Sequence, residues 1–319
     1  MYQTGMTIKQ TLDRVRKHEF VLPAIQREFV WQQEQICRLF DSLMQGYPFG
    51  TFLLWKVDAD NSSNFKFYDF VRNYHQRDRP HCEPLPDLHE KVTAVLDGQQ
   101  RLTALNIGLS GSMAVKLPRK RKNNPHAYPE SHLYLDLLYS AEPDEEGDQY
   151  RFEFLTGEQV EKSEPLSSCW FKVSKILEFT DTISLIDWVS DNIDSNQDMD
   201  GFKKQQKEAS RVLAKLHQVV HKDQTVAHYE EESQDLTTVL NIFIRMNSGG
   251  TQLSYSDLLL SIAVAQWEKR DARTEIHELV DEINRQRGDF DFSQDLVLKA
   301  GLLLNDINRV AFKVENFNR

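Results

Sequence analysis

The sequence around which the fold is expected to form is Val92-Thr93-Ala94-Val95-Leu96-Asp97-Gly98-Gln99-Gln100-Arg101-Leu102-Thr103-Ala104-Leu105. It begins as a short apolar run rich in β-branched residues, which is typical of a buried strand. Leu102, Leu105 and Leu109 then recur at helical spacing, which predicts the apolar stripe of a helix. These residues therefore predict a strand, a tight turn and a helix in direct succession, as in an α/β core.

The turn consists of Asp97, Gly98, Gln99, Gln100 and Arg101. Asp97 is expected to cap the helix, and Gln100 three residues later completes a capping box. Gly98 allows the tight turn and lets a ligand approach the backbone closely. Arg101 is the unusual residue, because the positive end of the helix dipole disfavours a cation there by about 0.3–1 kcal/mol.

A bound anion would reverse the sign of that interaction, and free backbone N–H groups at the same helix end would add donors. The turn is therefore a candidate site for a phosphate-sized anion, with Gln99, Gln100 and Arg101 as side-chain donors. The alternative is a well-capped helix with Arg101 turned to solvent. The motif by itself leaves both open, because short motifs often recur by chance.

Two more motifs accompany this one, Pro23-Ala24-Ile25-Gln26-Arg27 upstream and Asn247-Ser248-Gly249-Gly250 downstream. The three motifs in this order resemble the N-terminal domain of the GmrSD type IV restriction endonucleases, a family similar to the ParB/sulfiredoxin fold. In that resemblance, the Asp-Gly-Gln-Gln-Arg turn parallels the phosphate-contacting box of ParB-like nucleotidases. The motifs run from residue 23 to about residue 260, so the resemblance covers most of the chain.

The resemblance implies a nucleoside-triphosphate-hydrolysing, DNA-sensing domain of a modification-dependent anti-phage restriction protein. Its cofactor would be Mg²⁺ bound with the triphosphate, and its macromolecular partner would be DNA. The implied catalytic residues are Asp97, Gln100 and Arg101. The implied nucleotide-binding residues are Gln26, Arg27, Gly98, Gln99, Arg245, Asn247, Gly249 and Gly250. Asp97 has two competing roles, helix cap and ligand of metal or water, and the capping box favours the cap.

Two other functions stay open at this point. One is a DNA or modified-base binding module without turnover, and the other is a ParB-like nuclease. The sequence has no P-loop, no nucleophile elbow and no His-rich nuclease motif, so any DNA-cutting chemistry is expected outside this chain. No protein-borne metal site is predicted, and His81 and His89, which flank prolines, are expected to be solvated.

Composition describes an ordinary soluble globular protein, with 27% charged and 40% hydrophobic residues among 319. The net charge of −11 argues against a binder driven mainly by attraction to nucleic acid, although a local basic patch remains compatible with it. Such a patch is the run 116–122, whose Arg119, Lys120, Arg121 and Lys122 are candidate DNA contacts. A second basic run lies at 72–79. For both runs a solvated loop is the alternative.

A cytoplasmic location without membrane contact is expected. The three cysteines are far apart and fit a reducing compartment, the first ten residues contain no apolar signal segment, and the longest apolar stretches are too short to span a bilayer. The last residues carry no stop signal, which suggests a longer protein divided at a domain boundary.

The pattern predicts an α/β fold with a ParB/sulfiredoxin-like core in domain 1–175 and a mainly helical subdomain in 176–319. The latter carries the Asn-Ser-Gly-Gly motif and is expected to be truncated before a C-terminal effector domain. The expected strands are 20–22, 51–57, 65–68, 92–96, 132–138, 150–155 and 169–173. The expected helices are 7–17, 32–45, 98–109, 185–189, 201–220, 235–246, 273–287 and 294–304.

Overall fold

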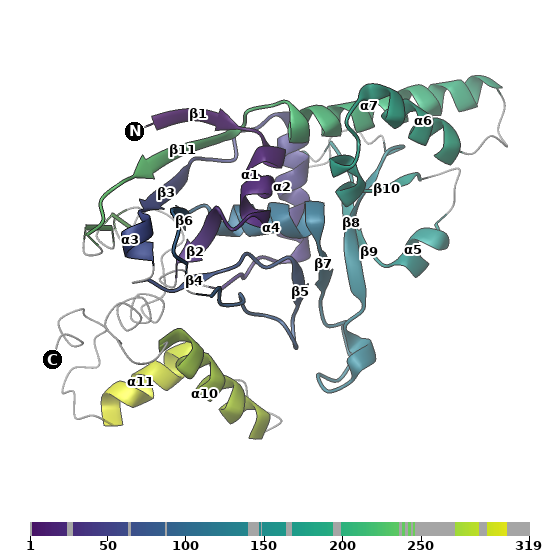
Figure 1. The fold of residues 1–319 in the computed structure, drawn as a ribbon. Coiled ribbons are helices and arrows are strands. Elements are labelled where there is room, and N and C mark those ends of the chain that lie inside the picture. The colour runs from purple at the N-terminus through teal and green to yellow at the C-terminus, as the bar shows by residue number, and fades with distance from the viewer. Residues whose placement is uncertain are drawn as a thin grey trace.

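A computed structural model describes most of the chain up to residue 245 and two helices beyond it (Figure 1). The described residues are 2–23, 28–62, 65–86, 88–139, 147, 149–163, 168–193, 199–235, 238–239, 242–243, 245, 272–286 and 292–304. They form two β-sheets with helices packed between and beside them. The predicted α/β class is therefore confirmed.

The larger sheet has six strands in the order β1-β11-β3-β6-β2-β4. Their bounds are β1 Tyr2–Met6, β2 Phe20–Pro23, β3 Phe52–Val57, β4 Phe67–Tyr68, β6 Val92–Asp97 and β11 Val226–Glu231. β6 lies between β3, to which it is antiparallel, and β2, to which it is parallel. The strand before the central turn is thus paired on both sides, which explains its continuous apolar sequence.

The smaller sheet has five strands, with β10, β8, β7 and β5 in order and β9 also paired to β8. Their bounds are β5 Asn73–His75, β7 Ser112–Ala114, β8 Glu130–Asp136, β9 Phe152–Leu155 and β10 Trp170–Lys172. β8 and β9 correspond to the expected strands 132–138 and 150–155, and they pair antiparallel. The sequence did not predict β5 or β7, because three residues are too few to show a period.

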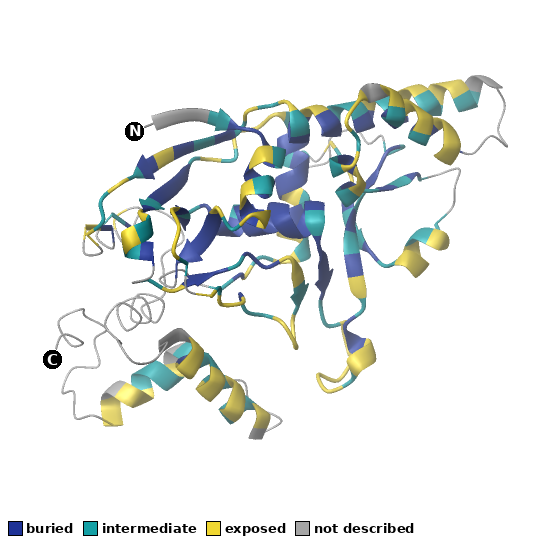
Figure 2. Ribbon diagram, viewed as in Figure 1, coloured by how far each residue is buried: buried dark blue, intermediate teal, exposed yellow. Residues whose placement is uncertain are grey.

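Helix α4 (Gln99–Ser110) is buried on nearly all sides (Figure 2). Its buried leucines belong to one apolar core together with residues of both sheets, such as Leu54 of β3 and Leu133 of β8. Gly108 provides the space needed for this packing, since a Cβ there would overlap the ring of Phe40. The sequence predicted one apolar stripe on this helix, whereas the structure surrounds it with core.

The opposite face of the larger sheet has its own core. Alternate residues of each strand point to opposite faces, so Phe52 and Leu54 of β3 face α4 while Leu53 and Trp55 face away. Val239 and Phe243 cover this second face, and the described residues between 238 and 245 are helical. A chain segment that precedes the Asn-Ser-Gly-Gly motif is therefore packed on the strands that lead to the central turn.

Two helices near the N-terminus begin and end where the sequence predicts. Helix α1 (Ile8–Arg16) starts at Thr7, whose hydroxyl accepts from the Gln10 N–H at 3.1 Å in a capping box. Helix α2 (Gln33–Gln45) ends at Gly46, which adopts the left-handed conformation. The core-facing side of α2 consists of Ile36, Leu39, Phe40, Leu43 and Met44, as the periodicity indicates.

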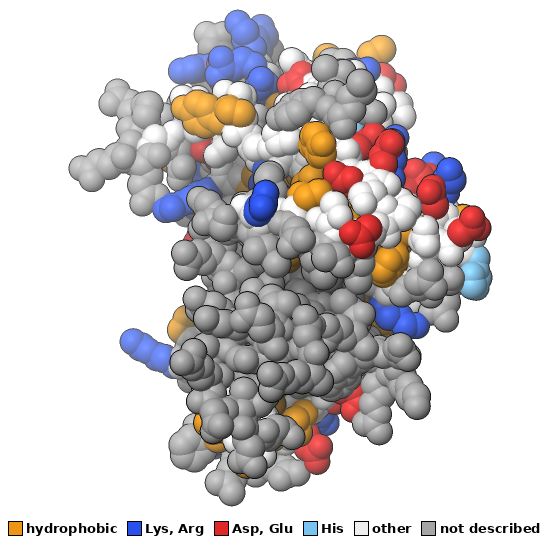
Figure 3. All heavy atoms as spheres, turned by 90° about the vertical axis from the view of Figure 1, so that its left-hand side faces the viewer, with side chains coloured by type: hydrophobic (Ala, Val, Ile, Leu, Met, Phe, Trp, Pro, Cys, Tyr) orange, Lys and Arg blue, Asp and Glu red, His pale blue; other side chains and the backbone are white. Residues whose placement is uncertain are grey.

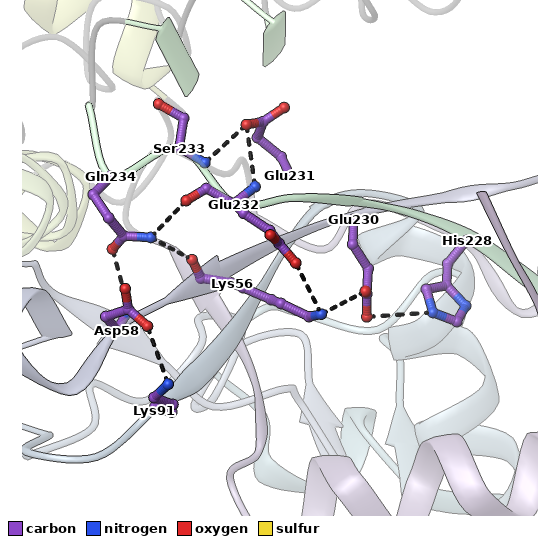
Figure 4. Close-up of polar contacts among 9 residues, drawn as sticks. All are labelled: Lys56, Asp58, Lys91, His228, Glu230, Glu231, Glu232, Ser233 and Gln234. Carbon is purple, nitrogen blue, oxygen red and sulfur yellow. Dashed lines mark hydrogen bonds and ion pairs between the residues drawn. The ribbon is translucent and has the colours of Figure 1, made fainter. Parts of the chain in front are cut away.

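Strand β11 is the main element that the sequence did not predict. It pairs parallel to β3 and antiparallel to β1, so a strand from the supposedly helical part of the chain enters the larger sheet. Lys56 of β3 binds Glu230 at 2.6 Å and Glu232 at 3.3 Å (Figure 4), and the hydrogen bond with Glu230 raises the pKa of Lys56. Buried His228 lies 3.6 Å from Glu230. Because His228 and Glu230 are buried polar residues, the sequence of β11 does not show the apolar alternation that predicts a strand.

The remaining helices are short or lie at the periphery. Helix α7 packs against α1, α2 and α6, while α10 and α11 contact each other. Their bounds are α3 Ala59–Ser62, α5 Gly157–Glu161, α6 Thr182–Asn192, α7 Met199–His221, α10 Ala272–Gln286 and α11 Gln294–Leu304, with 3-10 turns at Pro125–Ala127 and Val173–Leu177. Within the described part of the chain, no helix is both long and apolar enough to cross a bilayer.

Candidate functional site

The central turn joins the end of β6 to the start of α4. Asp97 is the last residue of β6 and lies opposite Leu53 of β3. Gly98 follows with φ of +91°, and a Cβ on it would overlap the ring of Phe52. A residue with a side chain would be strained in this conformation and would also displace the ring. The turn therefore requires glycine, as the sequence predicts.

The predicted capping role of Asp97 is wrong. Gly98 occupies the N-cap position of α4 and makes no side-chain cap, because β6 continues its pairing through Asp97 and keeps this residue in the strand. The Asp97 carboxylate instead lies 3.3 Å from the guanidinium of Arg101. The first N–H groups of α4 consequently have no capping side chain, which is the arrangement that binds anions at helix N-termini.

Gln100 also departs from the predicted capping box. Its side chain is buried, and its amide oxygen accepts from the Val30 N–H at 3.0 Å while its amide nitrogen donates to the Glu28 carbonyl at 2.9 Å. One side chain of the turn thereby fixes the backbone of residues 28–30. Gln26 and Arg27 immediately precede this backbone and themselves lie outside the described residues.

Arg101 points inward rather than to solvent. Its guanidinium donates to the carbonyl oxygens of Phe49 and Thr51, the latter at 3.0 Å, and lies over the Phe52 ring at 4.9 Å. Only 20% of the side chain is exposed. Burial lowers the pKa of Arg101, and the nearby Asp97 carboxylate opposes this shift. A mostly buried guanidinium is thus held in a fixed position beside a helix N-terminus that has no capping side chain.

The other predicted nucleotide ligands are placed only in part. Gln99 is buried in the first turn of α4, and Arg245 has an exposed side chain on the helical segment that covers the second sheet face. Asn247, Gly249 and Gly250 lie outside the described residues.

The two predicted basic runs lie side by side on the smaller sheet. The Gln76 side chain accepts from the Lys116 N–H at 2.8 Å, and the Gln76 N–H donates to the Ala114 carbonyl at 3.0 Å. Arg119, Lys120, Arg121 and Lys122 are exposed in the loop after β7. In Figure 1, α4 runs from β6 to β7, so this loop lies beyond the end of α4 opposite to the central turn.

One group of side chains escaped the sequence analysis. His81 was predicted to be solvated, but its ring lies 4.4 Å from that of His277, centroid to centroid, and both face Glu28. His89 is exposed, as predicted. The residues of the group are far apart in the chain and show no local spacing, so only the fold reveals them.

Comparison with known proteins identifies relatives of the chain. A model of the GmrSD restriction endonuclease N-terminal domain matches residues 8–264, a range that includes all three motifs. The chain is also similar to an uncharacterized protein of Methanocaldococcus jannaschii, with 32% identity over 139 residues. That alignment covers 43% of this chain and 21% of the relative, so the chain matches about a fifth of the length of that protein.

Proposed function

Since this chain belongs to the family of GmrSD restriction endonuclease N-terminal domains, we propose that it is the nucleoside-triphosphate-hydrolysing, DNA-sensing part of a modification-dependent restriction system. Membership in the family supports the restriction-related part of this proposal. The nucleotide and the sensing of modified DNA are the parts that the proposal adds.

The observation that carries the nucleotide part is Arg101 beside the uncapped start of α4. A guanidinium that is mostly removed from water is stabilised by a nearby anion, and the described residues supply only the partly exposed Asp97 carboxylate. The backbone N–H groups of Gln99 and Gln100 are at the positive end of the same helix. A triphosphate would supply the missing negative charge and accept from these donors.

Mg²⁺ fits this site through Asp97. Magnesium prefers oxygen ligands and is commonly held by one or two carboxylates together with phosphate oxygens. Asp97 provides a carboxylate at the turn, and 39% of its side chain is exposed, so one face remains accessible. When bound with the triphosphate, the ion would neutralise charge that develops during phosphoryl transfer.

The protein's own contribution would be positioning and electrostatic stabilisation, which dominate phosphoryl transfer. Arg101 is fixed by two carbonyl groups and a ring, so its orientation is set before a ligand arrives. Gln100 would act by fixing the backbone of residues 28–30 beside the turn. Both features reduce the reorganisation that is needed at the moment of reaction.

Release of inorganic phosphate by the purified chain tests the proposal. ATP, GTP, CTP and UTP are offered separately with Mg²⁺, without DNA and with plain or modified DNA. We expect turnover of at least one nucleotide, a strong loss in Asp97→Asn, and a rate unchanged in Asp60→Asn, which alters an exposed carboxylate on α3. Absence of turnover under every condition contradicts the proposal.

One observation favours a second candidate, a DNA-binding module without turnover. The guanidinium of Arg101 already binds two backbone carbonyls and Asp97, which is what a purely structural arginine would do. Binding of DNA that is unaffected by every nucleotide, together with absent phosphate release, would select this candidate.

A further inference from the structure

Glu28, His81 and His277 bring three metal-binding side chains together from distant parts of the chain. Glu28 comes shortly after β2 in the sequence, His81 lies in the loop after β5, and His277 is on α10. One ligand atom from each residue lies within 4.8 Å of the other two. From this geometry we infer a binding site for a first-row transition-metal ion, with zinc as its reference ion, that joins α10 to the central turn.

The distances suit an ion shared by the three groups. The Glu28 Oε1 atom is 3.7 Å from Nδ1 of His277 and 3.8 Å from Nδ1 of His81. Both separations are too long for a hydrogen bond. Two ligands of a tetrahedral zinc ion, each about 2.1 Å from the metal, are about 3.4 Å apart. Side-chain movements of less than about 1 Å would therefore complete the coordination.

The surroundings of the three groups also fit a built site. The Glu28 side chain is 19% exposed, that of His277 13% and that of His81 38%. Glu28 uses its other oxygen, Oε2, to accept from the Cys82 N–H at 3.3 Å, an outer contact of the kind that orients metal ligands. The Nδ1 atom of His81 is buried and has no hydrogen-bond partner among the described residues. A metal ion would satisfy it.

The donor set selects the class of metal. Two imidazole nitrogens and one carboxylate oxygen suit zinc, iron, manganese, cobalt or nickel, whereas magnesium and calcium prefer oxygen ligands alone. This site is therefore chemically distinct from the proposed magnesium position at Asp97. Three protein ligands would leave a fourth position for water or another ligand.

The site would connect two regions that the chain separates widely. The backbone carbonyl of Glu28 accepts from the side chain of Gln100 at 2.9 Å. One proposed metal ligand is therefore hydrogen-bonded directly to a residue of the central turn. His277 extends the connection to α10. A bound ion would thus fix α10 against the segment 28–30, and this role does not depend on nucleotide hydrolysis.

Metal binding by the full, untagged chain tests the inference. Protein freed of metal by dialysis against a chelator is titrated with ZnCl₂ in a calorimeter, and with CoCl₂ while the visible absorption of cobalt is recorded. We expect one equivalent of Zn²⁺ to bind, excess Mg²⁺ not to compete, and Zn²⁺ to raise the melting temperature. Failure of the unmodified protein to bind Zn²⁺ overturns the inference.

Three ligand variants and one control assign the site. His81→Ala, His277→Ala and Glu28→Gln should each weaken Zn²⁺ binding by about 100-fold or more, since loss of an outer-shell partner alone costs about 10–100-fold. His89→Ala, which changes an exposed histidine of the same loop, should bind like the unmodified protein. Equal affinity in all four variants overturns the assignment.

Hydrogen exchange in α10 gives a readout that is independent of affinity and activity. Zn²⁺ should slow exchange of residues 272–286 in the unmodified chain and in His89→Ala, but not in Glu28→Gln. Melting temperatures of the metal-free variants identify any that fail to fold, and Glu28→Gln is the most conservative of them. Unchanged exchange in the unmodified chain with Zn²⁺ bound would overturn the connection to α10.

Discussion

Arg101 illustrates how a single residue can be both scaffold and candidate ligand. The sequence marks it as unfavourable at a helix start and makes it a candidate ligand of an anion. The structure adds that its guanidinium donates to the carbonyl groups of Phe49 and Thr51, just before β3. Gly50 makes this approach possible, because a Cβ there would overlap the guanidinium. Arg101 therefore contributes to folding before any ligand binds.

Arg101→Ala is expected to lower the free energy of unfolding by about 1.5–3 kcal/mol, the range for hydrogen bonds to a charged group. It should also abolish the rise in melting temperature that a triphosphate causes. Arg16→Ala is the control, because exposed Arg16 contacts Ser110 and Asp13 at the surface, and it should change stability by less than about 0.5 kcal/mol. Urea unfolding measures both, and equal stability of the two variants would refute the scaffold role.

Gly98 and Gly46 form a matched pair for the central turn. Both have positive φ, +91° and +82°, but a Cβ on Gly98 would overlap Phe52 while nothing lies within 4 Å of one on Gly46. Gly46→Ala should cost about 1–2 kcal/mol for its backbone conformation alone. Gly98→Ala should cost about 1–3 kcal/mol more, because of overpacking. If urea unfolding shows the same loss of unfolding free energy in both variants, the Phe52 ring moves aside without cost and the prediction is wrong.

The roles of single residues could not be predicted where they depend on contacts between residues far apart in the sequence. The need for glycine at position 98 follows from a strand that passes directly into a helix. The contact of Gln100 with Val30 does not, because the two residues are 70 apart and meet only once the sheet has formed. Asp97 was assigned to the wrong role because its strand pairing outweighs the local preference for a cap.

Among the elements, α7 carries a stacked pair of histidines, of which His217 is buried and His221 half-buried, and this pair is expected to respond to pH. His217 and His221 stack with ring centroids 4.3 Å apart, and His221 contacts the Ile176 carbonyl at 2.9 Å. Burial lowers the pKa of both histidines below the ordinary value of 6.5, and Lys222 acts in the same direction. The folded chain therefore holds fewer protons on these rings than the unfolded chain does in mildly acidic solution.

The contribution of these two histidines to the free energy of unfolding should be fully present above about pH 6.5. It should be lost as the pH drops from there through their lowered pKa values, since protons then bind preferentially to the unfolded chain. His217→Gln should flatten this part of the curve of unfolding free energy against pH. His126→Gln, which alters an exposed histidine, should leave the curve unchanged. An identical slope in the unmodified chain and in His217→Gln would contradict the prediction.

Helices and strands were predictable where the hydrophobic pattern is regular over many residues. Helix α2 has five core residues at helical spacing and a glycine stop, and its ends agree with prediction within one residue. Strand β11 was missed because His228 and Glu230 occupy inward positions that normally carry apolar residues. Their burial depends on Lys56, which the chain supplies from a different strand.

Across the whole molecule, charge is distributed unevenly. The chain has a net charge of −11, and acidic side chains are spread over the upper right part of the face in Figure 3. The exposed loop 117–123 nevertheless concentrates Arg119, Lys120, Arg121 and Lys122 next to the other basic run. An acidic molecule with a basic surface at this loop would approach DNA in a preferred orientation.

Replacement of these four loop cations by glutamine should weaken DNA binding and flatten its dependence on salt, because each lost phosphate contact lowers the slope by about 0.9. Replacement of four exposed cations on α7, Lys203, Lys204, Lys207 and Arg211, removes the same charge elsewhere. This control should change the slope less. Fluorescence anisotropy at several salt concentrations measures both, and equal effects would assign DNA attraction to net charge alone.

The position of β11 between β1 and β3 has a consequence for synthesis on the ribosome. Translation delivers β1 and β3 early, but the strand that separates them emerges only when Val226–Glu231 has been made. Until then, β1 lacks its only neighbour in the described sheet and β3 presents an open edge to other nascent chains. The larger sheet is thus completed only after residue 231 has been made. Chains that end before Val226 keep β3 with an unpaired edge and should aggregate rather than accumulate as stable fragments.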